Sequence, residues 1–327
     1  MAGRRVVAVV PGSPHAAAAP PRSLRHLSDA ISFRSATADD SRACFAIFRG
    51  AIREILVRGG ELEPDAPMPD DAERWEHYES LFAHLAANCS QWWLAEDRDG
   101  RPLGYARSIE REGTLELTEF FVAAGARGGG VGRGLLERAF APGTGNHRCI
   151  IATTDPAAGA LYLRFGVSHQ TTANDMAGTP RAIALPAGYE AVPATLEDVL
   201  AIESELLGHG RAQEVAFMLA DRPATILRRD GRAVAYAFGP NAGSTHAGPV
   251  AALHPADLPA ALAQLENAAY AAGVATLYLT VPYAAQVAIA HLLERGFRLT
   301  PFLTLLLADG PWAKLDRYLP FNPCLFL

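Results

Sequence analysis

Apolar and polar positions along the chain follow two periods, and their order predicts an α/β protein with a mixed sheet flanked by helices. Starting at Ile31, a short strand pattern precedes a helical pattern that begins near Thr37–Asp40, where the side chains suit helix capping. A second helical pattern covers about residues 71–88. Two strand patterns then meet at Asp99-Gly100, a dipeptide typical of β-hairpin turns.

A glycine cluster interrupts the pattern in the stretch LTEFFVAAGARGGGVGRGLLERAF, residues 117–140. An apolar strand pattern leads into the glycines, and a helical pattern follows them. The next stretch, RCIIATTD, reads as a strand, and PAAGALYLRFGV reads as a helix that Gly166 ends.

The same order of elements returns from Tyr189, which indicates an internal repeat. It contains a hairpin at Asp230-Gly231, a strand that leads into a helix, a further strand and a helix that ends at Gly296. Val122-Ala123-Ala124 answers to Val250-Ala251-Ala252, and Gly166 answers to Gly296, at offsets of 128 and 130 residues. We therefore expect two tandem domains, residues 31–187 and 188–327. Residues 1–30, rich in proline and alanine, are expected to be a disordered leader, and the apolar closing segment DRYLPFNPCLFL is expected to pack on the body.

Charge and composition exclude several classes of partner. The net charge is −6, and neither half is basic, since 20 basic and 22 acidic residues precede Ala187 and 9 and 13 follow it. We therefore expect no nucleic-acid partner. No apolar run is long enough to span a membrane, and the scattered cysteines are typical of reduced thiols in a cytoplasm. His77 and His84 share a helical face without a third ligand nearby, so no metal site is expected.

The glycine cluster fits only one of three phosphate-binding patterns. It has no lysine for a Walker loop, and the dinucleotide fingerprint GxGxxG fails at Arg133 or Leu135. What remains is R-x-x-G-x-G from Arg127 to Gly132. A turn of this kind presents backbone N–H groups at a helix N-terminus, where they and the helix dipole suit a diphosphate. The alternative is that the glycines only turn a tight corner.

Two segments, FFVAAGARGGGVGRGLL and DPAAGALYLRFGV, resemble the motifs of the GNAT superfamily of acyl-CoA-dependent N-acetyltransferases. Asp155 stands where the family usually has asparagine, and Val167 where it usually has phenylalanine. The resemblance implies that acetyl-CoA is the co-substrate and lies across the sheet where the fourth and fifth strands splay. The residues it implies for cofactor binding are Phe120, Phe121, Val122, Arg127, Gly128, Gly129, Gly130, Val131, Gly132, Arg133 and Asp155. The tandem arrangement resembles two-domain members of the family.

The resemblance also implies catalytic roles. Tyr162 is placed to protonate the departing coenzyme A thiolate, although it also suits a packed aromatic residue. The backbone N–H of Val122 would polarise the thioester carbonyl. Glu116 and Glu119 precede the glycine turn, where the family often keeps a glutamate that acts as a base through water. In a regular strand the two glutamates face opposite sides unless a bulge intervenes, and we prefer Glu119.

Two further features refine the expected function. The segment ELEPDAPMPDDAERWEHYE, residues 61–79, holds eight acidic residues and Arg74, which indicates either steering of a cationic acceptor or a solvated surface. In the second repeat, Pro255–Ala260 aligns with Arg127–Gly132 and Leu292 aligns with Tyr162, so that copy is expected to be degenerate. We expect an acetyl-CoA-dependent N-acetyltransferase that acts on a primary amine of a small molecule or peptide by direct attack. The alternatives are an acyl-CoA-binding regulatory protein without turnover, and O-acylation or a longer acyl donor.

Overall fold

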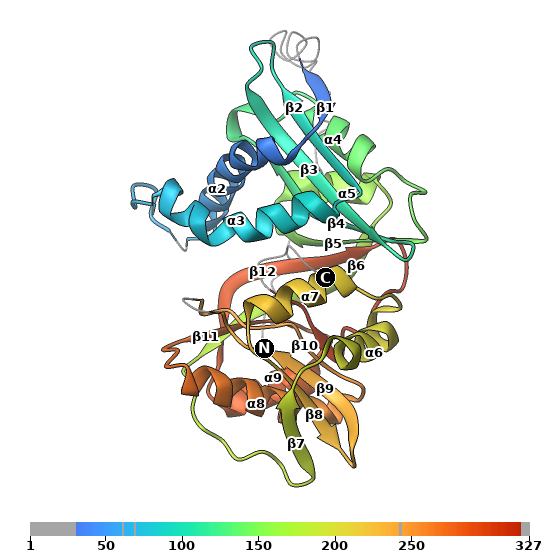
Figure 1. Cartoon of the computed structure of the whole chain (residues 1–327). Coiled ribbons are helices and arrows are strands. Elements are labelled where there is room, and N and C mark those ends of the chain that lie inside the picture. Colours follow the sequence, from blue (N-terminus) through green and yellow to red (C-terminus); the bar gives the residue numbers. More distant parts are fainter. Residues whose placement is uncertain (1–30, 61, 69, 242–243, 322–327) are drawn as a thin grey trace, which may run out of the picture.

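The computed structural model describes residues 31–321 except 61, 69 and 242–243, and it consists of two stacked halves (Figure 1). The elements of the first half are β1 (Ser32–Ser35), η2 (Ala38–Asp40), α2 (Ser41–Arg58), α3 (Asp71–Asn88), β2 (Gln91–Glu96), β3 (Pro102–Arg111), β4 (Thr114–Val122), η3 (Ala124–Ala126), α4 (Val131–Ala139), β5 (His147–Thr153), α5 (Pro156–Arg164) and β6 (Ser168–Gly178). Those of the second half are β7 (Tyr189–Pro193), α6 (Leu196–Leu207), α7 (Ala212–Asp221), β8 (Ala224–Arg229), β9 (Arg232–Phe238), β10 (Val250–Ala252), η4 (Pro255–Asp257), α8 (Leu258–Ala271), β11 (Leu277–Pro282), α9 (Gln286–Glu294), β12 (Arg298–Ala308) and β13 (Tyr318–Leu319).

Each half is a layered α/β unit because its strands alternate apolar side chains between two faces. In the first half, Leu115 and Leu117 of β4 pack against α4 and α5. On the opposite face, Leu94 and Tyr105 pack against the aromatic side chains of α2 and α3. The second half is arranged in the same way, with α8 and α9 on one face of its strands and α6 and α7 on the other. The mixed α/β architecture expected from the sequence is confirmed.

The two halves exchange a strand. The larger sheet has the order β1-β2-β3-β4-β5-β12-β6-β11, so β12 of the second half lies between β5 and β6 of the first. β12 pairs antiparallel with β5, whereas β6 pairs antiparallel with β11 of the second half. The remaining strands form a smaller sheet, β13-β10-β9-β8-β7. The division of the chain near residue 187 stays a prediction, and the shared sheet joins both sides of it.

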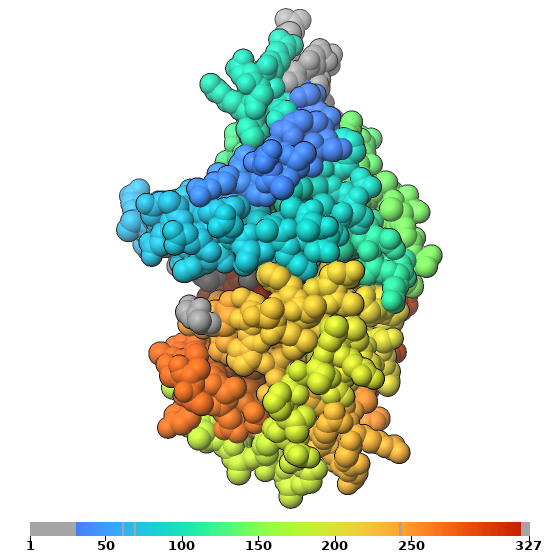
Figure 2. All heavy atoms as spheres, viewed as in Figure 1, coloured from blue at the N-terminus to red at the C-terminus, as the bar shows by residue number. Residues whose placement is uncertain are grey.

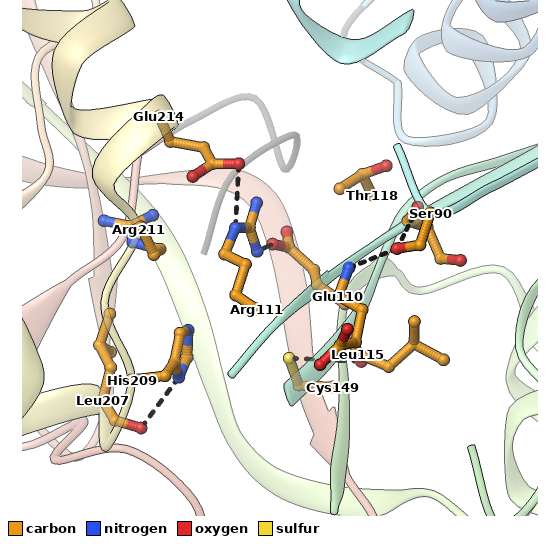
Figure 3. A network of polar contacts seen from close by, with 12 residues as sticks. Ser90, Glu110, Arg111, Leu115, Thr118, Cys149, Leu207, His209, Arg211 and Glu214 are labelled. Atoms are coloured by element: carbon orange, nitrogen blue, oxygen red, sulfur yellow. Dashed lines mark hydrogen bonds and ion pairs between the residues drawn. The ribbon is translucent and has the colours of Figure 1, made fainter. Parts of the chain in front are cut away.

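A buried ionic network also joins the halves. Arg111, at the end of β3, places Nη1 2.7 Å from Glu116 Oε2 and Nε 3.0 Å from Glu214 Oε1 of α7. Figure 3 shows Arg111 pointing from its strand toward the helix that carries Glu214. Beside it, the backbone N–H of Gly210 donates to Glu112 Oε2 at 3.0 Å. Burial of these charges requires their pairing, so the network holds the halves in one register.

The sequence patterns predict most elements, but they miss three that join the halves. The hairpins at Asp99-Gly100 and Asp230-Gly231 are present, and the second helix spans Asp71–Asn88. The patterns gave no indication of α7, β6 or β12. Residues 1–30, predicted to be a leader, lie outside the described residues. Of the closing segment, Tyr318, Leu319 and Phe321 are buried as expected, and residues 322–327 lie outside the described part.

Candidate active site

Strands β4 and β5 pair in parallel at their starts and then diverge within the sheet of the first half. Their parallel pairing joins Thr114–Glu116 to His147–Cys149. Beyond Glu116, β4 continues to Val122 along β3, while β5 continues along β12. Where two parallel strands separate, the backbone groups on their facing edges no longer pair with each other and can bind an extended ligand that crosses the sheet.

The glycine turn lies at the end of β4 and at the start of α4. Gly128 and Gly130 have φ angles of +84° and +90°, in the left-handed region that favours glycine, and Gly130 is the N-cap of α4. A Cβ atom at either position would meet no heavy atom within 4 Å, so the turn is open on its outer side. Gly132, in contrast, faces inward, where a Cβ would lie 3.1 Å from Phe120 Cζ. The first turn of α4 therefore presents its backbone N–H groups beside open space.

Three arginines surround the turn, and each contacts a carboxylate. Arg127 forms a two-point ion pair with Glu54 of α2, with Nη1 3.0 Å from Oε1. Arg133 pairs with Glu137 one helical turn further along α4. Arg58, at the end of α2, places Nη1 2.6 Å from Asp155 Oδ2. Each guanidinium group is thus balanced by a carboxylate, and it could contact an incoming anion only by sharing or exchanging that partner.

Asp155 caps α5. Its Oδ1 accepts from the backbone N–H groups of Ala157 and Ala158, each at 2.9 Å. Burial opposes the ionisation of Asp155, but the hydrogen bonds from Ala158 and Arg58 together hold its pKa below the usual value. A carboxylate at this position therefore fixes the start of the helix that carries Tyr162.

Tyr162 lies on α5 and faces β4. Its ring packs edge-to-face against Phe120, with the ring centroids 5.9 Å apart, and its side chain is 5 % exposed. Phe120 and Val122 belong to the same apolar cluster on the α4–α5 face. The described geometry thus brings together Tyr162, Phe120, Val122 and the glycine turn.

Glu119 lies on the opposite face of β4, beneath α2 and α3. Its Oε1 accepts from the Tyr105 hydroxyl at 2.8 Å, and its Oε2 lies 2.9 Å from Arg107 Nη1. Arg107 in turn stacks on Trp92, with its guanidinium carbon 3.8 Å from the ring centroid. Burial of the carboxyl group raises the pKa of Glu119 despite this arginine. Phe121, on the same face, contacts Phe48 of α2.

A bulge in β4 places Glu116 on the same face as Glu119. Arg107 pairs with Glu119 and Ser108 with Leu117, so Thr118 is the extra residue. This is the condition under which both glutamates face one side. They nevertheless serve different contacts, because Glu116 reaches Arg111 in the network that joins the halves.

The second half has no counterpart of the glycine turn in its described residues. Tyr105 pairs with Phe121 and Tyr236 pairs with Ala251, so the structural offset of the repeat at this strand is 130 residues. η4 therefore matches η3, which corrects the sequence alignment of Pro255–Ala260 with Arg127–Gly132. η4 runs directly into α8, whereas residues 127–130 separate η3 from α4.

A cavity of about 750 Å³ lies between the halves on the α2–α3 side. Figure 2 shows a recess between α3, in cyan, and α7, in gold. The first half contributes residues from α2, α3 and β6, among them Phe48, Arg74, His77, Tyr78 and Asp175. The acidic segment contributes Arg74 and His77 to the lining, while Asp71, Glu73, Glu76 and Glu79 are exposed on α3. The steering role of these carboxylates stays a prediction.

Several site residues were not identified from the sequence. Glu54 and Arg58 lie on α2 far from any motif, and only their helical spacing of four residues could have indicated that they share a face. Tyr105 and Arg107 alternate on β3, which predicts a common face but not a contact with Glu119. His84, expected to be a packing or surface residue, stacks on Phe217 with the ring centroids 4.4 Å apart.

No helix in the described ranges is long and apolar enough to cross a membrane. Within the same residues, no group of three or more His, Cys, Asp or Glu side chains is arranged to hold a metal ion.

Comparisons with known proteins support the resemblance noted in the sequence. Residues 88–168 match the family model of the acetyltransferase (GNAT) domain. A GCN5-related N-acetyltransferase from Sphaerobacter thermophilus is similar over 88 % of this chain and 98 % of its own, with 19 % identity and a TM-score of 0.59. A Pyrococcus horikoshii protein assigned as an acetyltransferase is similar over 94 % and 97 %, with 16 % identity and a TM-score of 0.64. A tandem GNAT protein of the clavulanic acid biosynthesis pathway is similar over 86 % and 99 %, with 18 % identity and a TM-score of 0.53. The resemblance to GNAT proteins, including the tandem arrangement, is confirmed.

Proposed function

Because residues 88–168 match the family model of the acetyltransferase (GNAT) domain, we propose that the first half binds acetyl-CoA and transfers its acetyl group to a primary amine of a small molecule or peptide. The observation that carries this proposal is the open glycine turn at the N-terminus of α4, at the end of the strand that diverges from β5. A diphosphate on this turn would accept hydrogen bonds from backbone N–H groups and interact favourably with the helix dipole. Arg127, Arg133 and Arg58 lie around it.

The cavity of about 480 Å³ between α4 and α5 suits the rest of the nucleotide. Arg133, Glu137 and Arg164 line it together with the apolar side chains of Pro142, Leu161 and Phe165, and Arg133 is paired with Glu137. Apolar walls beside guanidinium groups fit a flat base, and Arg164 is placed to contact a further phosphate on it. In this arrangement the pantetheine chain runs from the turn along β4 toward the gap between the strands.

The proposed reaction joins the amine nitrogen to the acetyl carbon and breaks the bond from that carbon to sulfur. The backbone N–H of Val122 would hold the carbonyl oxygen as negative charge develops on it. Tyr162 would give its proton to the coenzyme A thiolate. Glu119 would accept a proton from the amine, directly or through water. Burial raises the pKa of Glu119, which is the direction expected of a carboxyl group that accepts a proton during the reaction.

A binding experiment tests the cofactor site. Gly130→Glu would place a negative charge in the path of the diphosphate, and we expect coenzyme A affinity, measured by calorimetry, to fall about 100-fold or more. Gly100→Glu is the matched control, because Gly100 also has a positive φ, +74°, and open space, but lies in the β2–β3 hairpin. Equal affinity in the two variants would refute the site. The expected stoichiometry is one coenzyme A per chain.

A second candidate is an acyl-CoA-binding protein without turnover. It is favoured by one observation, that Glu119 is fully buried and already paired with Arg107 and Tyr105. Release of free thiol from acetyl-CoA, measured against a panel of primary amines, separates the two functions. An enzyme releases thiol in proportion to the amine, whereas a binding protein retains acetyl-CoA unchanged with every amine.

A further inference from the structure

We propose that Glu54 and Arg58 of α2 form a latch across the ends of the diverging strands, and that a diphosphate on the glycine turn opens it by taking Arg127 from Glu54. The closed latch consists of two ion pairs, Glu54 with Arg127 and Arg58 with Asp155. Its opening rests on the proposed function, because it requires coenzyme A on the turn. Glu54 and Arg58 act through their partners and take no part in the bond changes.

The two ion pairs connect α2 to both sides of the β4–β5 gap. Arg127 lies in the turn that follows β4, and two of its nitrogens contact the Glu54 carboxylate, with Nη1 3.0 Å from Oε1. Asp155 follows β5 and caps α5, and its Oδ2 lies 2.6 Å from Arg58 Nη1. Glu54 and Arg58 are four residues apart, so they occupy successive turns on one face of α2. This end of α2 therefore bridges the elements that follow the two diverging strands.

Packing holds the beginning of α2 more firmly than its end. The buried residues of the helix are Ser41, Cys44, Phe45, Ile47, Phe48 and Ala51. Residues 52–57 are only half-buried, and Arg58 is exposed. With little buried apolar surface, the last two turns depend on polar contacts such as these ion pairs for their position. Loss of the ion pairs should therefore loosen this end of the helix.

Both ion pairs are exposed enough to exchange partners. The side chains of Arg127 and Glu54 are 37 % and 39 % exposed, and that of Arg58 is 45 % exposed. Ion pairs in such positions are weak, because water and salt screen them. A diphosphate carries more negative charge than one carboxylate and accepts several charge-assisted hydrogen bonds, so it competes well for the Arg127 guanidinium.

The groups released by this exchange have partners within reach. Glu54 precedes Arg58 by four residues, the spacing at which a glutamate and an arginine pair favourably along a helix. Their charges already interact, because the Asp155 hydrogen bond raises the pKa of Arg58 and the Glu54 charge adds to the same shift. Asp155 keeps its hydrogen bonds from the backbone N–H groups of Ala157 and Ala158, each at 2.9 Å. Each of the charged groups thus retains a partner when the latch opens.

Movement of this end of α2 would also change the cavity between the halves. Ile52, Ile55 and Leu56 line that cavity from the same two turns of the helix. The latch thereby couples the occupancy of the glycine turn to the shape of the cavity on the α2–α3 side, through one helix that contacts both.

Hydrogen–deuterium exchange of the full chain, followed by mass spectrometry, tests the latch in peptides that cover residues 52–58. Without coenzyme A, Glu54→Gln and Arg58→Gln should each exchange this segment about threefold faster or more than the wild type, because one ion pair to it is lost. Glu96→Gln is the matched control, since Glu96 pairs with Arg34 of β1 instead, and its exchange over this segment should match the wild type. Unchanged exchange in both Glu54→Gln and Arg58→Gln would overturn the latch.

Saturating coenzyme A tests the opening. We expect it to speed the exchange of residues 52–58 in the wild type and to have no further effect in Glu54→Gln, because the pair that the diphosphate breaks is already absent. Coenzyme A should also bind Glu54→Gln about threefold more tightly than the wild type, since the carboxylate no longer competes for Arg127, and Glu96→Gln should bind it as the wild type does. Unchanged or slower exchange of the segment with bound coenzyme A, or weaker binding by Glu54→Gln, would refute the opening. If calorimetry shows no binding to the wild type, the proposed function fails instead, and exchange in the free proteins still decides whether the latch exists.

Discussion

The turn before α4 in the first half and the equivalent turn before α8 in the second half differ in conformation and in charge. In the first half, residues 127–130 separate η3 from α4, and positive φ angles at Gly128 and Gly130 leave the helix N-terminus open. In the second half, η4 leads directly into α8, and the carboxylate of Asp257 lies buried at the helix N-terminus with the Arg229 guanidinium and the Tyr189 hydroxyl. The Asp257 carboxylate makes no side-chain hydrogen bond to the N-terminus of α8 and pairs with Arg229, whereas the first half has an open glycine turn at the equivalent place. The comparison shows that the repeat keeps its fold although the turn before the helix differs.

A second comparison concerns two equivalent tyrosines and the buried glutamates that accept their hydrogen bonds. Tyr105 and Tyr236 occupy matching places on β3 and β9, and each donates to a buried glutamate at 2.8 Å. In the first half the glutamate is Glu119, on the diverging strand β4. In the second half it is Glu203, on α6, paired with Arg211. Both glutamates are paired in the interior, but only Glu119 lies on the strand that leads to the glycine turn.

Removing one half should have the largest effect. A chain that ends at Ala187 loses β12, which lies between β5 and β6, and so exposes Ile150 and Ile151 of β5, which share apolar clusters with Leu307 and Leu306 of the lost strand. We expect an insoluble or unfolded product, measured by soluble yield and circular dichroism. The control is coexpression of residues 1–187 with residues 188–327, which should restore a soluble complex. A soluble, cooperatively unfolding first half would show that the exchanged strand is dispensable.

Neutralising Glu119 or Glu203 should destabilise the fold to a similar extent, but only the change at Glu119 should lower turnover. Glu119→Gln and Glu203→Gln each leave a buried arginine without its full partner, and each should lower the free energy of unfolding by about 3–5 kcal/mol. At a temperature where both variants are folded, Glu119→Gln should lose at least 100-fold in turnover, consistent with the loss of a base. Glu203→Gln should keep wild-type turnover. Equal turnover in the two variants would remove Glu119 from the chemistry.

Equivalent positions on α5 and α9 test the proton donor. Tyr162→Phe keeps the ring that packs on Phe120 and removes the hydroxyl, so turnover should fall about 100-fold with nearly unchanged coenzyme A affinity. Leu292→Tyr introduces the missing hydroxyl in the second half, where no glycine turn accompanies it, and should leave turnover unchanged. Wild-type turnover in Tyr162→Phe would mean that Tyr162 only packs.

Neutralising Glu214 at the junction between the halves should have the smallest effect, a change in how stability depends on pH. Burial disfavours the charged form of Glu214, but Arg111 outweighs it and holds the pKa below the usual value. A depressed pKa in the folded state stabilises the fold above the unfolded-state pKa of about 4.3, and this contribution is lost as the pH falls through the folded-state value. Denaturant unfolding between pH 7 and pH 3.5 should therefore show a smaller acid loss in Glu214→Gln than in the wild type. Parallel curves for the two proteins would contradict the assignment.

The sequence by itself determined the local elements and the resemblance to the GNAT superfamily. Periodicity located the strands and helices with strong patterns, and the spacing from Arg127 to Gly132 indicated the anion turn, because such features depend on neighbouring residues. The same reasoning placed Tyr162 on a helix that the structure sets against Phe120. The motif also revealed that Leu292 replaces this tyrosine in the second copy.

Only the tertiary structure decided how the two copies share their parts. Pairing of β12 with β5 depends on residues about 150 positions apart in the chain, and no local pattern encodes such a partner. The same holds for Arg58 with Asp155, for Arg111 with Glu214, and for the cavity that Asp175 faces from a strand the sequence did not reveal. Pairing across the sheet, rather than local propensity, sets which charges are buried together and where the cavity between the halves lies.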